Sequence, residues 1–439
     1  MKIGFISLGC SKNTIDTEMM LAHLDNASYE ITADAEEAEV ILINTCGFIG
    51  DAREESIETI KEMARYKKTG KLKKLIVTGC LAERWRDKLM QKMPEIDAVA
   101  GLGEIHNIVE TIKTSLEKEK YQAFGDYEKT DIDGERMLSD ESPSVFLRIS
   151  EGCDNRCSYC AIPKIRGRYR SRTIESIIEE AQDLESAGAK ELNLIAEDTS
   201  RYGTDLYHEN KLPELLRRLS KETTIPWIRI FYCYPDRITD ELIAEMRDNP
   251  RVLPYLDMPI QHISDDVLKR MNRGGNRKQI ETVIRKLRQE IPDMVIRTTV
   301  IVGFPGETDE QFNELLDFIK DVRFNRLGAF TYSREEGTPA FDMPDQIAEE
   351  IKQERYETLM ETQAEISLQH QQAVIGQTRT VLCEGFDEEE ELFVGRDFSN
   401  GFDVDGKVFF YSEKPVETGE FVRVKITDAE EYDLFGETV

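Results

Sequence analysis

The sequence predicts an α/β protein that begins with a doubly wound parallel sheet, continues with a partial (β/α)6 barrel and ends with a small antiparallel β-barrel. Short apolar runs alternate with amphipathic helical patterns over residues 1–124, and the same alternation returns over residues 144–332. After residue 376 the pattern changes to closely spaced strands. Alternating βα segments indicate parallel sheets, whereas successive short strands indicate a barrel or sandwich.

The N-terminal part contains three apolar runs, KIGFISL, EVILIN and KLIVT, and each is followed by a polar amphipathic stretch. This order is typical of a parallel sheet with helices on both faces, so we assign residues 1–124 to one domain. Residues 125–143, GDYEKTDIDGERMLSDESP, are polar, acidic and interrupted by Gly and Pro. We expect a linker there.

The central part, residues 144–370, contains six strand candidates, VFLRI, ELNLIAE, WIRIFYC, YLDMPI, VIRTTVIVGF and LGAFTYS, with helical patterns between them. Six βα units predict a barrel or partial barrel whose active site lies at the carboxyl ends of the strands. Residues 347–376 predict a long helix that ends this part. Five short strands over residues 372–439 then predict the small β-barrel or a sandwich.

The composition describes a soluble globular protein, because 40% of the 439 residues are hydrophobic and 33% are charged. Nothing resembles a membrane span, and the start MKIGFISLGCSKN lacks the cleavage site of a signal peptide. We therefore expect a cytoplasmic protein whose eight cysteines serve as metal ligands or catalytic groups before they serve as disulfides. The net charge of −29 disfavours nucleic acid and favours a basic protein partner.

Three of the cysteines, Cys153, Cys157 and Cys160, lie in the segment EGCDNRCSYC directly after a predicted strand. A cubane iron-sulfur cluster normally takes four cysteines, so three would leave one iron with an open position. An open position distinguishes a reacting metal from a structural one. The alternatives are a zinc site with a distant fourth ligand, or three incidental thiols.

The spacing C-x3-C-x2-C, with Tyr159 before the last cysteine and a βα barrel around it, resembles the radical S-adenosylmethionine superfamily. The resemblance implies a 4Fe-4S cluster whose open iron binds S-adenosylmethionine and whose electron releases a 5′-deoxyadenosyl radical. It also implies that Tyr159, Glu197 and Arg297 contact the cofactor. The alternative for Glu197 and Arg297 is that they are ordinary charges on the rim of the barrel.

Cys10, Cys46 and Cys80 form a second set, because SLGC, INTC and VTGC each close an apolar strand. The carboxyl ends of parallel strands share one edge of a sheet, so three loops would bring three thiolates together there. The alternative is that these cysteines are small buried hydrophobic residues. Cys233 and Cys383 have no cysteine nearby in the sequence, and we expect ordinary buried thiols.

Two cysteine trios in this order resemble the methylthiotransferases, a radical S-adenosylmethionine family, and the C-terminal strands then correspond to a TRAM domain. The segments SLGCSKNTIDTE, NTCGFIGDAREESIE and TGCLAERW resemble the RimO-type branch, which methylthiolates an aspartate of small-subunit ribosomal protein S-twelve. The resemblance implies two 4Fe-4S clusters, S-adenosylmethionine and an electron donor such as flavodoxin or ferredoxin.

Charge supports this branch over the tRNA-modifying branch, which is the alternative with the same clusters and chemistry. Residues 372–439 contain 6 Lys and Arg against 17 Asp and Glu, a net charge of −11. A domain that holds tRNA should be basic, so tRNA is not expected as a partner, although the acidic residues could simply form a solvated surface. A non-catalytic metal-binding adaptor is the alternative from another class of protein.

Overall fold

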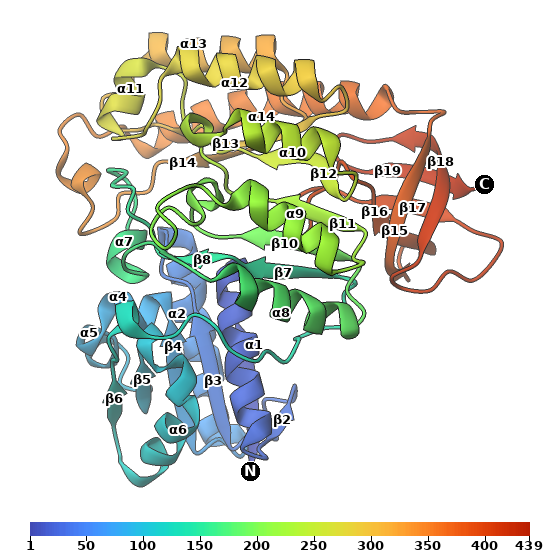
Figure 1. Ribbon diagram of the computed structural model, residues 1–439. Coiled ribbons are helices and arrows are strands. Elements are labelled where there is room, and N and C mark those ends of the chain that lie inside the picture. Colours follow the sequence, from blue (N-terminus) through green and yellow to red (C-terminus); the bar gives the residue numbers. More distant parts are fainter. The chain divides into compact units, whose positions relative to one another are not determined.

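A computed structural model describes residues 1–439 and divides the chain into two compact units (Figure 1). The N-terminal unit consists of Met1–Glu141, Ser150–Arg172 and Ser333–Phe341, and the C-terminal unit consists of Ser142–Ile149, Thr173–Tyr332 and Asp342–Val439. The domain bounds at residues 124, 143 and 370 stay predictions.

The N-terminal unit is built on a six-stranded parallel sheet with the order β2-β1-β3-β4-β5-β6. Its strands are β1 (Lys2–Ser7), β2 (Glu30–Thr32), β3 (Val40–Thr45), β4 (Lys74–Gly79), β5 (Ala98–Ala100) and β6 (Tyr121–Ala123). Its helices are α1 (Ser11–Asn26), α2 (Gly50–Ala64), α3 (Tyr66–Thr69), α4 (Cys80–Trp85), α5 (Asp87–Lys92), α6 (Ile108–Glu117) and α7 (Ile162–Ile165). A two-stranded antiparallel ribbon, β8 (Ser150–Glu151) and β9 (Arg170–Ser171), completes the unit.

The sheet is covered because its central strands are apolar on both faces. All six residues of β3 are buried. Ile41 and Ile43 of β3 pack in one core with Ile60 of α2 and Leu89 of α5. The sequence predicted β1, β3 and β4 but missed β2, β5 and β6, because three residues are too few to show an alternating pattern.

The C-terminal unit contains a six-stranded parallel sheet with the order β14-β13-β12-β11-β10-β7, in which neighbours in the chain are neighbours in space. Its strands are β7 (Ser144–Arg148), β10 (Glu191–Ile195), β11 (Trp227–Ile230), β12 (Val252–Asp257), β13 (Val295–Val302) and β14 (Arg326–Thr331). Its helices are α8 (Ile174–Ser186), α9 (Leu212–Glu222), α10 (Asp240–Asp248), α11 (Asp265–Arg270), α12 (Arg277–Glu290), α13 (Asp309–Val322) and α14 (Glu349–Gln372). Because β7 and β14 are unpaired edges, the barrel is incomplete, which confirms the predicted partial barrel.

The helix α14 leads into a closed barrel with the strand order β15-β16-β17-β19-β18 (Figure 1). Its strands are β15 (Thr378–Asp387), β16 (Leu392–Arg396), β17 (Val408–Tyr411), β18 (Phe421–Ala429) and β19 (Leu434–Thr438). The predicted C-terminal barrel is confirmed, with one correction. β17 and β19 pair in parallel, because β18 lies on the far side of β19 and the chain crosses over to reach it.

A buried cluster of charges joins this barrel to the sheet of the same unit. The carboxylate of Glu191 in β10 accepts hydrogen bonds from Arg396 of β16 and, at 2.7 Å, from Nε of Arg229 in β11. Burial raises the pKa of Glu191, but the two guanidinium groups outweigh burial and lower it to about 2. The sheet and the barrel are therefore held together by charges that remain ionised at neutral pH. None of the helices in the structure combines the length and the apolar character needed to cross a bilayer.

Candidate metal centre

The first cysteine trio lies where three neighbouring strands end. Cys10 precedes α1 and follows β1, Cys46 follows β3 directly, and Cys80 begins α4 directly after β4. These strands are adjacent and parallel, so their carboxyl ends meet at one edge of the sheet. The structure thus brings together the three residues that the sequence singled out, with Cys10 exposed and the other two buried.

Asn13, in the first turn of α1, connects the three strand ends. Its side-chain amide donates hydrogen bonds to the backbone oxygen of Leu8, at 2.8 Å, and to that of Thr45, at 3.1 Å. Its Oδ1 accepts from the thiol of Cys80 at 3.5 Å. Asn13 is only 1% exposed, so it holds the loops from inside. Asn13 stands in the motif SLGCSKN, but the sequence does not predict its role, since many polar residues flank the cysteines.

The thiols of the first trio are close enough to influence one another. A methyl group at Gly9 would lie 3.3 Å from Sγ of Cys46. The pKa of the Cys80 thiol is raised to about 12, chiefly by burial; Arg166 lowers it, whereas Cys10 and Cys46 raise it. Burial is also the main cause that raises the pKa of Cys46. At neutral pH these two thiols are therefore protonated in the metal-free chain, and metal binding must release their protons.

The backbone before Cys80 requires glycine. Gly79 has φ +91°, in the left-handed region that L side chains rarely adopt. A Cβ atom there would lie 2.5 Å from the backbone oxygen of Thr45 and 2.7 Å from its nitrogen. β4 can approach the end of β3 this closely only with glycine at this position, and the close approach brings the two cysteine loops together.

The second trio lies in the loop that follows β8. The backbone N–H of Cys160 donates to the oxygen of Cys157 at 3.1 Å, and that of Cys153 donates to the oxygen of Gly167 at 3.1 Å. These bonds curl the loop and close it at its base. Cys153 and Cys157 are buried, while Cys160 and Tyr159 are partly exposed. The loop belongs to the same compact unit as the first trio, so both trios lie in the N-terminal unit.

Arg166 joins the two cysteine loops from inside the unit. Its Nη2 donates to Oδ1 of Asn13 at 2.8 Å and to Oδ2 of Asp16 at 2.9 Å, and both residues belong to α1, which follows Cys10. Its Nη1 donates to Oε2 of Glu151, at the start of the second loop, at 3.0 Å. The Arg166 side chain is 1% exposed. Sequence reasoning missed it because the run IRGRYRSR contains four arginines and nothing local distinguishes one from another.

The other residues predicted to contact the cofactor lie in the C-terminal unit. Glu197 follows β10 and is partly buried. Arg297 lies in β13, where Nη1 donates to Oδ1 of Asp257 at 2.9 Å and Nε lies 3.5 Å from Oδ1 of Asp405. The charge of Arg297 is therefore already balanced by two carboxylates. The roles of Tyr159, Glu197 and Arg297 stay predictions.

The donor set fits an iron-sulfur cluster. In a cubane cluster each thiolate binds a different iron, so the sulfurs stand farther apart than the ligands of one ion. Three thiols at adjacent strand ends, without a carboxylate or imidazole among them, match the soft ligands that such clusters take.

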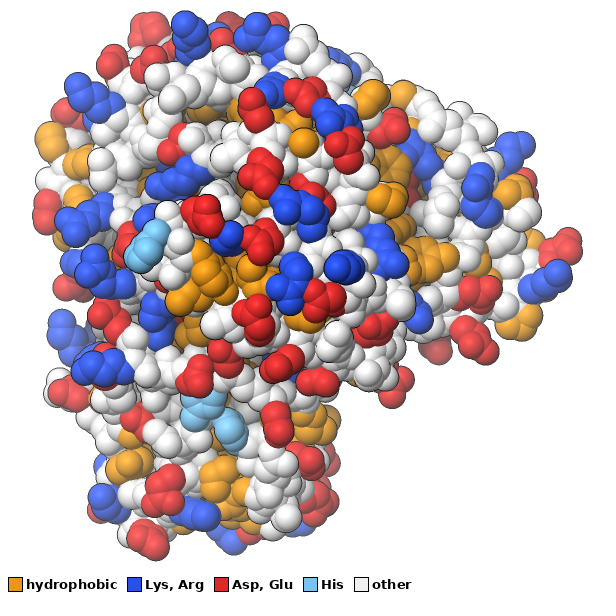
Figure 2. Space-filling view, viewed as in Figure 1, with side chains coloured by type: hydrophobic (Ala, Val, Ile, Leu, Met, Phe, Trp, Pro, Cys, Tyr) orange, Lys and Arg blue, Asp and Glu red, His pale blue; other side chains and the backbone are white.

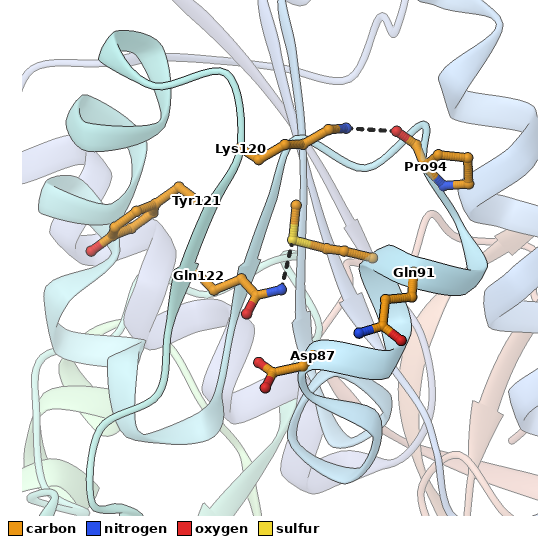
Figure 3. A pocket seen from close by; sticks show the side chains of 7 residues that line it. Asp87, Gln91, Pro94, Lys120, Tyr121 and Gln122 are labelled. Atoms are coloured by element: carbon orange, nitrogen blue, oxygen red, sulfur yellow. Dashed lines mark hydrogen bonds between the residues drawn. The ribbon is translucent and has the colours of Figure 1, made fainter.

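A separate hollow of about 510 Å³ lies in the N-terminal unit, beside α5 and the first residues of β6 (Figure 3). Lys120 crosses it to donate to the oxygen of Pro94 at 2.6 Å, and Gln122 points at the sulfur of Met90. None of the cysteines lines this hollow. It lies near the amino end of β6, whereas the first trio follows the carboxyl ends of its strands, so it is not part of the candidate centre.

Three family models match successive parts of the chain. The model "Uncharacterized protein family UPF0004" matches residues 2–101, the Radical SAM superfamily model matches residues 147–319, and the TRAM domain model matches residues 375–439. Each match falls on one of the three parts that the sequence predicted.

Solved structures show the same fold at low sequence identity. The radical S-adenosylmethionine methyltransferase TsrM from Kitasatospora setae matches with a TM-score of 0.54 and 14% identity, over 77% of this chain and 76% of its own. The cobalamin-dependent enzyme OxsB matches with a TM-score of 0.51 and 13% identity, over 83% of this chain and 56% of its own. The Radical SAM and TRAM family models, together with the fold and the cysteine loop, define a protein of the radical S-adenosylmethionine class with a C-terminal TRAM domain.

Curated relatives match over the full chain. Proteins named "Ribosomal protein uS12 methylthiotransferase RimO" are 50% identical in Desulforamulus reducens and 49% in Thermoanaerobacter sp. strain X514, each over 99% of both chains. The protein of that name from Geobacter sulfurreducens is 46% identical over 100% of this chain and 98% of its own. This chain belongs to the family of RimO ribosomal protein uS12 methylthiotransferases.

Proposed function

We propose that this chain inserts a methylthio group at the β-carbon of an aspartate in ribosomal protein uS12. The observation that carries the proposal is the placement of two cysteine trios in one compact unit. The supporting finding is the 46–50% identity, over the full chain, to proteins that bear the name of this activity. An unactivated carbon resists acid-base chemistry, so radical chemistry that a cofactor supplies suits this reaction.

The two cysteine trios have separate roles in this proposal. Cys10, Cys46 and Cys80 would hold one 4Fe-4S cluster, and the loop of Cys153 would hold the other. When bound, the clusters supply an electron for cleaving S-adenosylmethionine and a site that carries sulfur. The protein fixes the loops, keeps most of the thiols out of water and releases their protons on loading. We keep Tyr159, Glu197 and Arg297 as the predicted contacts to S-adenosylmethionine.

Charge supports a basic protein substrate. The C-terminal segment, residues 372–439, carries 6 basic and 17 acidic side chains within a chain whose net charge is −29. Acidic and basic side chains are interspersed on the visible face (Figure 2). An acidic surface raises the rate at which a basic protein finds it.

The test is a reaction of anaerobically reconstituted enzyme with S-adenosylmethionine, a chemical reductant and either purified uS12 or unmodified tRNA. We expect the mass of uS12 to rise by one methylthio group at a single aspartate, and tRNA to stay unchanged. A methylthio adduct on tRNA adenosine without one on uS12 contradicts the proposal. A Cys153→Ala variant is the control for adducts that form without the second cluster.

The reductant and the location complete the proposal. Flavodoxin or ferredoxin would donate the electron, and the reaction would take place in the cytoplasm. Replacing the chemical reductant by purified flavodoxin with its reductase tests the first point, because loss of all turnover under those conditions excludes that donor. Fractionation of cells from the source organism tests the second.

A further inference from the structure

The segment Ser333–Phe341, which we call the strap, links parts of the N-terminal unit that are distant in sequence. It follows β14, the last strand of the parallel sheet in the C-terminal unit, yet it packs within the N-terminal unit. It contains no strand, and it ends in a short helical turn, Pro339–Asp342. Its place is therefore fixed by its contacts, and these contacts reach both cysteine loops.

Glu335 anchors the strap to the elements that carry the first trio. Its Oε2 accepts from Nη1 of Arg53, in α2, at 2.8 Å and from Nη1 of Arg84, in α4, at 2.8 Å. Its Oε1 accepts from the hydroxyl of Ser333 at 2.6 Å. The Glu335 side chain is 2% exposed. Burial raises its pKa, but the bonds to Ser333 and the two arginines outweigh burial, and the net effect lowers it. The carboxylate is thus ionised at neutral pH.

Arg84 connects Glu335 to the cysteine loops of the first trio. It lies in α4, the helix that Cys80 begins. Its Nη1 also donates to the backbone oxygen of Gly47, at 2.8 Å, and Gly47 follows Cys46 directly. Its Nη2 donates to the backbone oxygen of Glu336 at 3.0 Å. One guanidinium group therefore contacts the loop of Cys46, belongs to the helix of Cys80 and binds the strap.

The other half of the strap contacts the second cysteine loop. The backbone N–H of Ala340 donates to the oxygen of Ser158 at 2.8 Å. Ser158 lies between Cys157 and Cys160 in the sequence. Nζ of Lys164, in α7 just after that loop, donates to the backbone oxygen of Gly337 at 2.5 Å. The strap thus touches the loops of both trios within nine residues.

We propose that the strap sets the spacing between the two cysteine trios and that Glu335 is its positioning residue. This inference rests on the proposed function in one respect, namely that the two trios act on the same substrate. A misplacement of about 1 Å between reacting groups can cost on the order of a hundredfold in rate. Cleavage of S-adenosylmethionine needs the second trio, whereas product needs both trios at the right separation. Loosening the strap should therefore lower the yield of product more than the cleavage.

The experiment compares Glu335→Gln with Glu336→Gln in the reconstituted full-length enzyme. Glu336 is the adjacent strap residue with an exposed side chain, so its variant makes the same chemical change without touching the anchor. Three quantities are measured: iron and sulfide per chain, the electron paramagnetic resonance spectrum of the reduced enzyme without substrate, and methylthiolated uS12 per 5′-deoxyadenosine. The spectrum reports the magnetic interaction between two reduced clusters and so depends on their separation.

For Glu335→Gln we expect unchanged iron content and a weaker or more heterogeneous magnetic interaction. Product per 5′-deoxyadenosine should fall about ten- to hundredfold, the usual effect of removing a group that orients metal ligands. Glu336→Gln should match the wild type in all three measurements. An unchanged spectrum together with an unchanged product ratio in Glu335→Gln overturns the inference. A loss of iron also overturns it, because Glu335 would then be needed to retain a cluster and not to set the separation between the two trios.

Two further arms keep the test decisive. Should Glu335→Gln fail to fold, Arg53→Met removes one of its two cations at a side chain that is 25% exposed, and the same spectral change is expected. An unaltered spectrum in a folded Arg53→Met variant then counts against the strap. Should wild-type enzyme give no methylthiolated uS12, the proposed function fails, but the spectrum recorded without substrate still decides the role of the strap.

Discussion

Replacing Arg166 by methionine should destabilise the N-terminal unit strongly, because it removes a buried cation that pairs with two buried carboxylates. Asp16 and Glu151 pair with Arg166 at 2.9 and 3.0 Å, and their side chains are 1% and 0% exposed. Removing one partner of a buried ion pair typically costs about 3–5 kcal/mol, since the remaining charge keeps its desolvation penalty. We expect a loss in this range.

The assay is urea unfolding in a Trp227→Phe background. The chain has two tryptophans, Trp85 in the N-terminal unit and Trp227 in the C-terminal unit, so the fluorescence then reports the N-terminal unit alone. Stability falls by about 1–3 kcal/mol per molar urea for small proteins, so the midpoint of Arg166→Met should drop by roughly 1–5 M.

The matched control is Arg168→Met, two residues along the same loop. Arg168 lies 3.7 Å from Asp154, but its side chain is 76% exposed. Exposed pairs contribute about 0–1 kcal/mol, so this variant should unfold close to the wild type. Equal midpoints for Arg166→Met and Arg168→Met would refute the reasoning, because burial would then not decide the cost.

Three further changes have expected outcomes. Gly79→Ala should lower the free energy of unfolding of the N-terminal unit by about 2–4 kcal/mol, because its φ is left-handed and its Cβ would contact the backbone of Thr45. Trp85 fluorescence in urea measures this loss, and a change below about 0.5 kcal/mol would count against the strain. Glu191 has a folded pKa of about 2 against an ordinary 4.5, so its pairing with Arg396 stabilises the protein above pH 4.5 and is lost as the pH falls toward 2. At about 1.4 kcal/mol per pKa unit, this pairing contributes about 3 kcal/mol. In urea titrations Glu191→Gln should therefore be less stable than the wild type at pH 7 and closer to it at pH 3. A stability difference that does not change with pH contradicts the pairing. Cys153→Ala should keep about half of the iron of the reconstituted wild type by metal analysis and lose all cleavage of S-adenosylmethionine, and full iron content would exclude Cys153 as a ligand.

Much of the fold could be predicted because its signals are local. The six strands of the partial barrel each show an apolar run bounded by polar helical patterns, and all six occur where the sequence predicted them. The first trio could be predicted for a similar reason. A cysteine directly after an apolar run marks a strand end, and parallel strands bring their ends to one edge. Family membership, predicted from the same segments, is confirmed by relatives over the full chain.

The missed features depend on which distant segments meet. β17 and β19 pair in parallel because the chain crosses over, and neither sequence shows this. The contact between Arg53 and Glu335 spans 282 positions along the chain. No periodicity relates residues so far apart, since hydrophobic spacing reports only whether a side chain is buried.

The sequence by itself determined the three parts, the strand ends and the soft thiol character of the candidate ligands, because each follows from residue type and short-range spacing. Only the tertiary structure decided which charges lie beside those thiols. Arg166 and Arg168 stand in one short run, yet one side chain is 1% exposed and the other 76%. Their side chains are chemically identical. They differ because α1, about 150 residues away in the sequence, packs against Arg166 and removes its guanidinium group from water, whereas that of Arg168 stays in water.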